Sequence, residues 1–234
     1  MEYEEVIYSG GTIKYLTERQ TKDVINDREL ENELELRDTN KCDLTPNVYE
    51  GGFKVWECAL DLVKYMDGIE VGGISVYEIG CGAGIPGILA AKKGAKSVDF
   101  QDFNKTVIDC FTKENVKLNE LEVVDCNFQH GDWSDNQVEI EKSGKRYDMI
   151  LTSETIYSSQ NYANLHSLFD KALSHHKDAY ILLGAKMYYF GVGGGVFEFM
   201  DFVKEQKCFD CQIVYKTETC LKRFILKLTR LSQA

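Results

Sequence analysis

The stretch VYEIGCGAGIPG, residues 76–87, decides the fold and raises the question of the ligand. A short apolar run is followed by three alternating glycines, Gly80, Gly82 and Gly84, and then by Pro86. The apolar run predicts a buried strand, and a proline in the first turn suits the start of a helix. Glycines between the two allow the backbone to come close to a ligand. The segment therefore predicts a strand, a ligand-binding turn and a helix.

Short apolar runs alternate with helical patterns on both sides of this segment. Strands are expected over 74–79, 96–102, 122–129, 147–153 and 178–186, and helices over 54–66, from 85, over 104–119, 162–173 and 196–206. The last two apolar runs, 211–217 and 221–229, meet at a short turn and need antiparallel pairing. This alternation predicts an α/β fold, a Rossmann-like doubly wound seven-stranded sheet with a terminal antiparallel pair.

The first 47 residues have a different character. EEVIYSGGTIKYL predicts a hairpin around residues 9–11, and the charge-rich 17–38 predicts a segment that is only partly helical. We therefore expect an acidic N-terminal extension over 1–47, an arm rather than a domain, followed by one domain over 48–234.

Two ligands fit the glycine turn. GAGIPG matches the dinucleotide pattern G-x-G-x-x-G, whereas GCGAG matches the turn that holds S-adenosylmethionine. Glu78 precedes the turn, and its carboxylate would repel a pyrophosphate but favour the sulfonium and ammonium of S-adenosylmethionine. Asp102 ends the second strand and can accept from both ribose hydroxyls of either ligand. The terminal antiparallel pair, absent from an all-parallel dehydrogenase sheet, also favours S-adenosylmethionine as the cofactor.

The net charge of −11 limits which classes of molecule the protein can bind. It argues against direct nucleic-acid binding, which needs a basic face. It suits a basic protein partner such as a ribosomal protein, although ordinary acidic solubility explains it equally well.

Other features bear on location and metals. No run approaches the roughly 18 apolar residues of a membrane helix, and the start has no signal-peptide pattern. We expect a cytoplasmic or nuclear protein, a monomer, with no membrane partner. The single C-x-x-C at 208–211 has no second pair, so no metal site is expected.

Four further segments resemble one family. NVYEGGFKVWECALDLV (47–63), LTSETIY (151–157), AKMYYFGVGGG (185–195) and LKRFIL (221–226) are similar to the eukaryotic histidine protein methyltransferases. These are seven-β-strand, class I S-adenosylmethionine-dependent enzymes related to a protein-lysine branch. The resemblance covers 43–228, and residues 1–42 match nothing that we can assign.

The resemblance implies methyl transfer to a histidine ring nitrogen of a large-subunit ribosomal protein, the third of the L series. It also implies a set of cofactor residues, to which the residues themselves add Glu78 and Asn104; Asn104 can also cap the helix after it. The set is Trp56 and Glu57 at the methionine end, Glu78, Gly80 and Gly82 around the turn, Gln101, Asp102, Phe103 and Asn104 at the ribose and adenine, Gly131, Asp132 and Trp133 beside the adenine, and Ser153 closing the site.

Polar residues after the fourth strand are the catalytic candidates. Glu154 lies where α/β active sites collect, and its carboxylate can accept the N–H of a neutral imidazole. That contact would leave the far, τ nitrogen to attack. Tyr157, together with the aromatic residues 188–190, suits either a histidine or a lysine acceptor. A protein-lysine methyltransferase therefore remains an alternative, and so does a cofactor-binding chaperone or scaffold of the ribosomal target.

Overall fold

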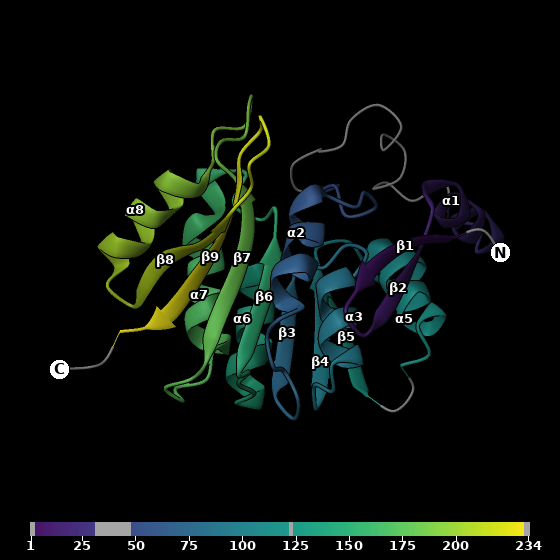
Figure 1. Ribbon diagram of the computed structural model, residues 1–234, viewed down its shortest axis with the longest axis horizontal. Helices are drawn as coiled ribbons and strands as arrows, with labels where there is room; N and C mark the ends of the chain where they lie inside the picture. The colour runs from purple at the N-terminus through teal and green to yellow at the C-terminus, as the bar shows by residue number, and fades with distance from the viewer. Residues whose placement is uncertain (1–2, 31–47, 122–123, 232–234) are drawn as a thin grey trace.

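The computed structural model describes residues 3–30, 48–121 and 124–231 of the chain. These residues form a seven-stranded sheet flanked by helices and a separate two-stranded sheet (Figure 1). The predicted fold class is confirmed, including the terminal antiparallel pair.

The large sheet has the order β5-β4-β3-β6-β7-β9-β8. Its first five strands are parallel, whereas β9 runs antiparallel to both of its neighbours. The chain turns from one half of the sheet to the other beside β3, the position where open α/β sheets bind their ligands. The strands are β3 (Ser75–Ile79), β4 (Ser97–Asp102), β5 (Asp125–His130), β6 (Met149–Ser153), β7 (Tyr180–Lys186), β8 (Phe209–Lys216) and β9 (Arg223–Arg230).

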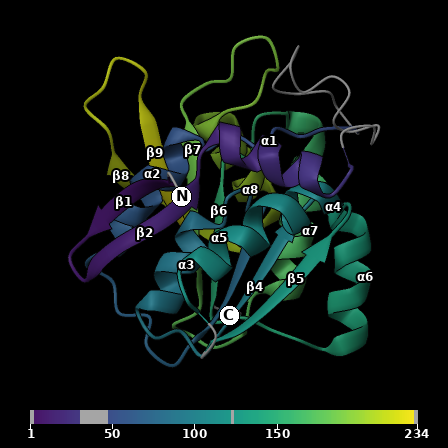
Figure 2. The same ribbon diagram turned by 90° about the vertical axis from the view of Figure 1, so that its right-hand side faces the viewer.

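Helices cover both faces of the sheet (Figure 2). One face carries α2 (Glu57–Met66), α3 (Ile85–Lys92) and α5 (Lys113–Leu118), and the other α6 (Trp133–Ser143), α7 (Tyr162–Ala172) and α8 (Val196–Gln206). A single 3-10 turn (Ser159–Asn161) leads into α7. Each face encloses its own apolar core, because a buried parallel strand presents side chains to both sides. Within the described ranges, every helix is too short or too polar to traverse a bilayer.

The helix expected over 104–119 is interrupted. It comprises α4 (Lys105–Val107), a π-helical turn (Ile108–Thr112) and α5. Thr112 Oγ1 donates to the Gly82 carbonyl at 2.7 Å, and Asn115 Nδ2 donates to the Ala83 carbonyl at 2.9 Å. Such turns are frequent at functional sites. Here the segment anchors the glycine turn.

Two local expectations differ from the structure. Asn104 does not cap α4 with its side chain, because its Oδ1 accepts from the Glu50 amide at 3.3 Å while its Nδ2 donates to the Val48 carbonyl at 2.8 Å. The helix α6 was not expected at all. Its start is nevertheless marked by Asp132, which accepts from the Ser134 amide at 2.8 Å, and its end by Gly144 with a φ of 65°.

The N-terminal residues form the expected hairpin, β1 (Tyr3–Tyr8) and β2 (Gly11–Leu16), followed by α1 (Glu18–Asp27). Thr17 caps α1 in a reciprocal capping box with Gln20. The hairpin packs on the domain: Ile13 is fully buried in the first core, and the Leu16 amide donates to Asn115 Oδ1 at 2.8 Å. The described part of the extension therefore contributes to the main core.

Candidate active site

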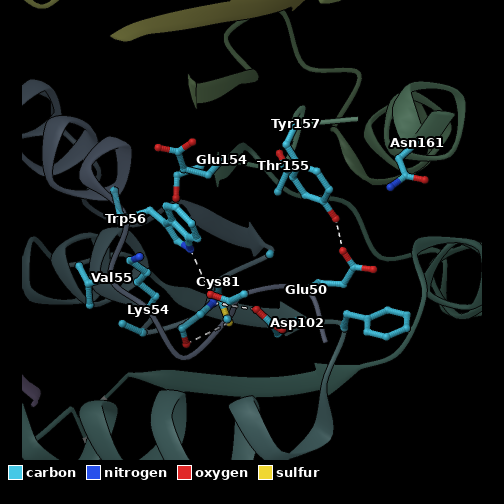
Figure 3. A pocket seen from close by; sticks show the side chains of 18 of the residues that line it. Glu50, Lys54, Val55, Trp56, Cys81, Asp102, Glu154, Thr155, Tyr157 and Asn161 are labelled. Atoms are coloured by element: carbon cyan, nitrogen blue, oxygen red, sulfur yellow. Dashed lines mark hydrogen bonds between the residues drawn. The ribbon is translucent and has the colours of Figure 1, made fainter. Parts of the chain in front are cut away.

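A pocket opens at the carboxyl ends of β3, β4 and β6 (Figure 3). Figure 3 shows Glu154, Thr155 and Tyr157 on one side and Cys81 and Asp102 on the other. The segment 48–56, here called the strap, supplies a further wall. The lining residues are Glu50, Gly51, Gly52, Lys54, Val55, Trp56, Ala59, Gly80, Cys81, Gly82, Ala83, Ile85, Asp102, Phe103, Asp132, Trp133, Ser153, Glu154, Thr155, Tyr157, Asn161 and Asn164.

The glycine turn requires glycine for two reasons: its backbone is left-handed, and it lies close to the strap. Gly80 and Gly82 have φ values of 61° and 49°, in the left-handed region that side chains disfavour. A Cβ on Gly82 would lie 2.9 Å from the Gly52 carbonyl oxygen of the strap. The turn can approach the strap this closely only because position 82 lacks a side chain.

Asp102 joins the turn to the end of β4. Its Oδ2 accepts from the Gly82 amide at 2.9 Å, and its Oδ1 accepts from the Asn104 amide at 3.3 Å. Burial raises the pKa of Asp102 to about 6, against the opposing effect of these backbone donors. A carboxylate oxygen has room for more than one donor, so Asp102 can hold the turn and still accept ribose hydroxyls.

Glu78 is placed differently from the expectation that its charge faces the ligand. It is buried, and its Oε2 accepts from the Gly87 amide in the first turn of α3 at 2.8 Å, outside the pocket lining. Burial raises its pKa to about 8, so at neutral pH the carboxyl is largely protonated. The electrostatic choice between ligands therefore cannot rest on Glu78.

The other predicted cofactor residues divide into two groups. Those that line the pocket are Trp56, Gly80, Gly82, Asp102, Phe103, Asp132, Trp133 and Ser153. Those that do not line it are Glu57, Glu78, Gln101, Asn104 and Gly131. Gln101 supports the site from behind: its Oε1 accepts from the Gly80 amide at 3.3 Å and its Nε2 donates to the Gly131 carbonyl at 2.8 Å.

A second pocket adjoins the first and shares four of its wall residues. It is lined by Glu50, Trp56, Glu154, Tyr157, Lys186, Tyr188, Tyr189, Phe190, Val192 and Leu221. The shared residues are Glu50, Trp56, Glu154 and Tyr157. Both predicted catalytic residues thus lie on the wall between two pockets, one beside the glycine turn and one largely aromatic.

Glu154 has an unusual backbone and an unusual environment. Its φ is 59°, a conformation that is uncommon for a residue with a side chain and that clusters at functional sites. Glu154 is 8% exposed, and neither carboxylate oxygen has a partner at good hydrogen-bond geometry among the described residues, although the Cys58 thiol and the Tyr189 hydroxyl lie close enough to interact with it. The Lys186 ammonium lies 3.5 Å from Oε1. A buried carboxylate with free acceptor capacity can receive a donor from a ligand.

Two residues of these pockets were not expected from the sequence. Glu50 accepts a hydrogen bond from the Tyr157 hydroxyl, so the strap and the segment after β6 face each other across the pocket (Figure 3). Burial raises the Tyr157 pKa, and the Glu50 charge adds to the effect. Lys186 pairs with Glu57 at 3.3 Å and with Glu154. The sequence could have indicated Lys186 as a site residue by its position at the carboxyl end of a parallel strand.

The chemistry of the first pocket fits S-adenosylmethionine. Its lining includes four carboxyl groups, those of Glu50, Asp102, Asp132 and Glu154, against the single ammonium of Lys54. This balance favours a ligand that carries a sulfonium and an ammonium and disfavours a pyrophosphate. Cys208 and Cys211 lie away from the pocket at the start of β8, and no described residues form a cluster of three or more metal-binding side chains.

Comparison with known proteins agrees with this chemistry. A family model described as lysine methyltransferase matches residues 40–192. The chain is 39% identical over 214 residues to the histidine protein methyltransferase 1 homolog of Mus musculus, covering 80% of this chain and 59% of the relative. The homolog from Dictyostelium discoideum is 40% identical over 167 residues, covering 70% and 52%. The chain therefore spans between half and three-fifths of the length of these relatives.

Solved structures share the fold. The magnesium protoporphyrin IX methyltransferase of Synechocystis, determined with bound S-adenosylhomocysteine, superimposes with a TM-score of 0.57 at 16% identity, covering 92% of this chain and all of that one. At this identity the likeness concerns the fold, and it supports the architecture. The family match covers well over half of the chain, and S-adenosylmethionine is the cofactor of this family. The chain belongs to the seven-β-strand S-adenosylmethionine-dependent methyltransferases, in the family that includes the histidine protein methyltransferases.

Proposed function

We propose that this protein transfers a methyl group from S-adenosylmethionine to the τ nitrogen of a histidine in a protein substrate. The names of the similar proteins support histidine as the acceptor. The observation that carries the proposal is Glu154, whose buried carboxylate stands on the wall between the two pockets with free acceptor capacity.

Transfer requires that one ring nitrogen points its lone pair at the methyl group, which is a task of positioning. The bound cofactor supplies an electrophilic methyl group on a sulfonium. Glu154 accepts the N–H of the nitrogen nearer the backbone and so fixes the tautomer, which directs the lone pair of the τ nitrogen toward the first pocket. After transfer the ring is cationic, and Glu154 stabilises it until the remaining N–H proton leaves to solvent.

Apolar residues at the rim of the second pocket support a protein as the substrate. Tyr188, Phe190, Val192 and Leu221 are between 42% and 81% exposed, with Phe190 the most exposed. Apolar side chains that remain in water beside a pocket mark an interaction surface. The net charge of −11 adds attraction to a basic partner. These features support a basic protein as the substrate, and the family resemblance of the sequence leads us to propose a large-subunit ribosomal protein, the third of the L series. We also propose a monomeric enzyme in the cytoplasm or nucleus, where ribosomal proteins are made and assembled.

A lysine acceptor is the second candidate, favoured by the description of the matching family model. Aromatic rings suit a lysine cation, and the second pocket contains several. A lysine, with an ordinary pKa near 10.4, must also lose a proton before it can attack, whereas histidine is mostly neutral at pH 7.

The test is methylation of a cell lysate with a radioactive methyl donor, followed by amino-acid analysis of the labelled band. We expect τ-methylhistidine in a large-subunit ribosomal protein. Methyl-lysine alone, π-methylhistidine, or labelling of RNA with no labelled protein would each contradict the proposal. A protein that binds the cofactor but labels nothing would instead be a chaperone or scaffold.

The role of Glu154 is tested with Glu154→Gln, since an amide can accept the N–H but brings no charge. We expect this variant to keep its affinity for S-adenosylmethionine and to lose most of its turnover. Wild-type turnover should also fall below about pH 6.5, where a free imidazole becomes protonated. Turnover of the variant at the wild-type rate would remove Glu154 from the mechanism.

A further inference from the structure

We infer that Lys186 is a specificity-determining residue that makes the acceptor pocket select a neutral imidazole and reject an ammonium. The inference rests on the proposed function and concerns the choice between its two candidate acceptors. It assigns that choice to one side chain at the end of β7.

The Lys186 ammonium occupies the part of the second pocket that an acceptor cation would use. Its Nζ lies 3.5 Å from Glu154 Oε1, 3.3 Å from Glu57 Oε2 and 4.8 Å from the centroid of the Trp56 ring. The Tyr189 ring lies at 6.0 Å. The Lys186 side chain is only 13% exposed. A carboxylate and aromatic rings are the groups that recognise a lysine side chain, and here a lysine of the protein already engages them.

An incoming acceptor lysine would therefore bring a second ammonium next to the first. Like charges placed together in a partly desolvated site repel strongly. A neutral imidazole brings only an N–H, for which Glu154 retains acceptor capacity. Lys186 offsets part of the negative charge of Glu50, Glu57 and Glu154, and so weakens the attraction of this site for a cationic acceptor.

The groups around Lys186 come from several elements. Lys54 of the strap also lies over the Trp56 ring, at 4.9 Å from its centroid, but it lines the first pocket, whereas Lys186 lines the second. Glu57 and Cys58 come from α2, Glu154 follows β6 and Tyr189 follows β7. Burial opposes the charged form of Lys186, but the two carboxylates outweigh it and raise its pKa above the ordinary value. Burial also raises the pKa of the Cys58 thiol and of Tyr189, so both remain neutral.

The neighbouring cation on β9 is engaged elsewhere. Arg223 Nε donates to Asp61 Oδ2 at 2.5 Å, and both side chains are at most 16% exposed. Arg223 also does not line the second pocket, whereas Lys186 does. The charged residues that line the second pocket are thus Lys186, Glu50 and Glu154, and Glu57 pairs with Lys186 from outside the lining.

The same charge acts on the product. The methylated ring is a cation while it keeps its N–H, and Lys186 disfavours that form. Loss of the proton to solvent gives a neutral methylhistidine. Lys186 therefore promotes the proton loss that ends the reaction, in addition to excluding a protonated acceptor at its start.

The experiment compares Lys186→Met with wild type and with Lys222→Met, which removes an exposed lysine outside the pocket. The probe is the third large-subunit ribosomal protein in two forms. One form is the intact protein. In the other form, the histidine that the enzyme methylates, located by mass spectrometry, is replaced by lysine. Affinity for both forms is measured by calorimetry with S-adenosylhomocysteine present, so that no transfer occurs. Turnover on the intact protein is measured as a function of pH.

For Lys186→Met we expect the preference for the histidine form over the lysine form to fall by at least about tenfold. We also expect the acidic limb of turnover to move to higher pH by about one unit, because the acceptor cation is no longer repelled. Lys222→Met should match wild type in both measurements. A merely structural role would lower turnover equally at every pH and leave the preference unchanged.

The inference is overturned if the wild type methylates histidine and Lys186→Met keeps both the preference and the pH profile. That outcome differs from failure of the proposed function, in which the wild type methylates no histidine. If Lys186→Met fails to fold, Lys186→Gln takes its place, and Lys186→Arg, which keeps the charge, should keep the wild-type preference. Loss of the preference in Lys186→Arg would show that shape rather than charge selects the acceptor.

Discussion

At the scale of single residues, Asp102 holds the glycine turn and is predicted to contact the cofactor. Its two oxygens already accept from backbone amides, so Asp102→Ala removes a ligand contact and loosens the turn together. Hydrogen bonds to a charged group contribute about 1.5–3 kcal/mol each, so we expect at least a tenfold loss of affinity for S-adenosylmethionine by calorimetry. Asp102→Asn should lose less, because its amide oxygen still accepts from the Gly82 amide. Wild-type affinity in the Ala variant would contradict this role.

Glu78 should make stability depend on pH in the direction opposite to most carboxyl groups. Its pKa is raised from 4.5 to about 8 in the folded protein, so folding favours its protonated form. The contribution of Glu78 to the free energy of unfolding is complete below about pH 4.5. It is lost as the pH rises through about 8, at about 1.4 kcal/mol per pH unit.

The measurement is urea unfolding of wild type and Glu78→Gln at several values between pH 6 and 8, above the range where Asp102 adds its own loss. We expect the free energy of unfolding of the wild type to fall with pH and that of Glu78→Gln to fall less. Glu205→Gln, on the surface of α8, is the control and should follow the wild type. Parallel curves for Glu78→Gln and the wild type would show that this carboxyl is ionised when buried.

At the scale of elements, Asn115 of α5 joins the N-terminal hairpin to the glycine turn. It accepts from the Leu16 amide at 2.8 Å and donates to the Ala83 carbonyl at 2.9 Å. Asn115→Ala leaves two buried backbone groups unpaired, at about 1–3 kcal/mol each. We expect a lower melting temperature and weaker binding of S-adenosylmethionine.

Asn119 provides the matched control, because it binds the hairpin without touching the turn. It accepts from the Lys14 amide at 3.0 Å and donates to the Lys14 carbonyl at 2.6 Å. Asn119→Ala should lower the melting temperature and leave cofactor affinity unchanged. If both variants bind the cofactor as the wild type does, the contact of α5 with Ala83 does not hold the turn in its binding conformation.

At the scale of the whole molecule, the net charge of −11 should govern the encounter with a basic substrate. Attraction between the two proteins is screened beyond about 8–10 Å at physiological ionic strength. We expect the association rate with the proposed ribosomal substrate, measured by stopped flow, to fall as salt rises, while the dissociation rate changes less. An association rate that is independent of salt would indicate that the charge serves solubility alone.

The sequence by itself determined the architecture and much of the first pocket. The alternation of apolar runs and helical patterns predicted the parallel strands and the terminal antiparallel pair, because these periodicities are local. The glycine turn, Asp102, Trp133 and Glu154 were found for a related reason: the carboxyl ends of parallel strands meet at one edge, so a residue that ends a strand is placed by its position in the chain.

The tertiary structure alone decided where side chains point and which residues pair with the charged ones. Glu78 accepts from the start of α3 and not from the ligand side, and Asn104 binds the strap instead of capping its helix. The contacts of Lys186 with Glu57 and Glu154, and of Glu50 with Tyr157, join positions far apart in the chain. Periodicity identifies which face of an element is buried, but not which element covers it, so the acceptor pocket and its charge became visible only when the sheet was assembled.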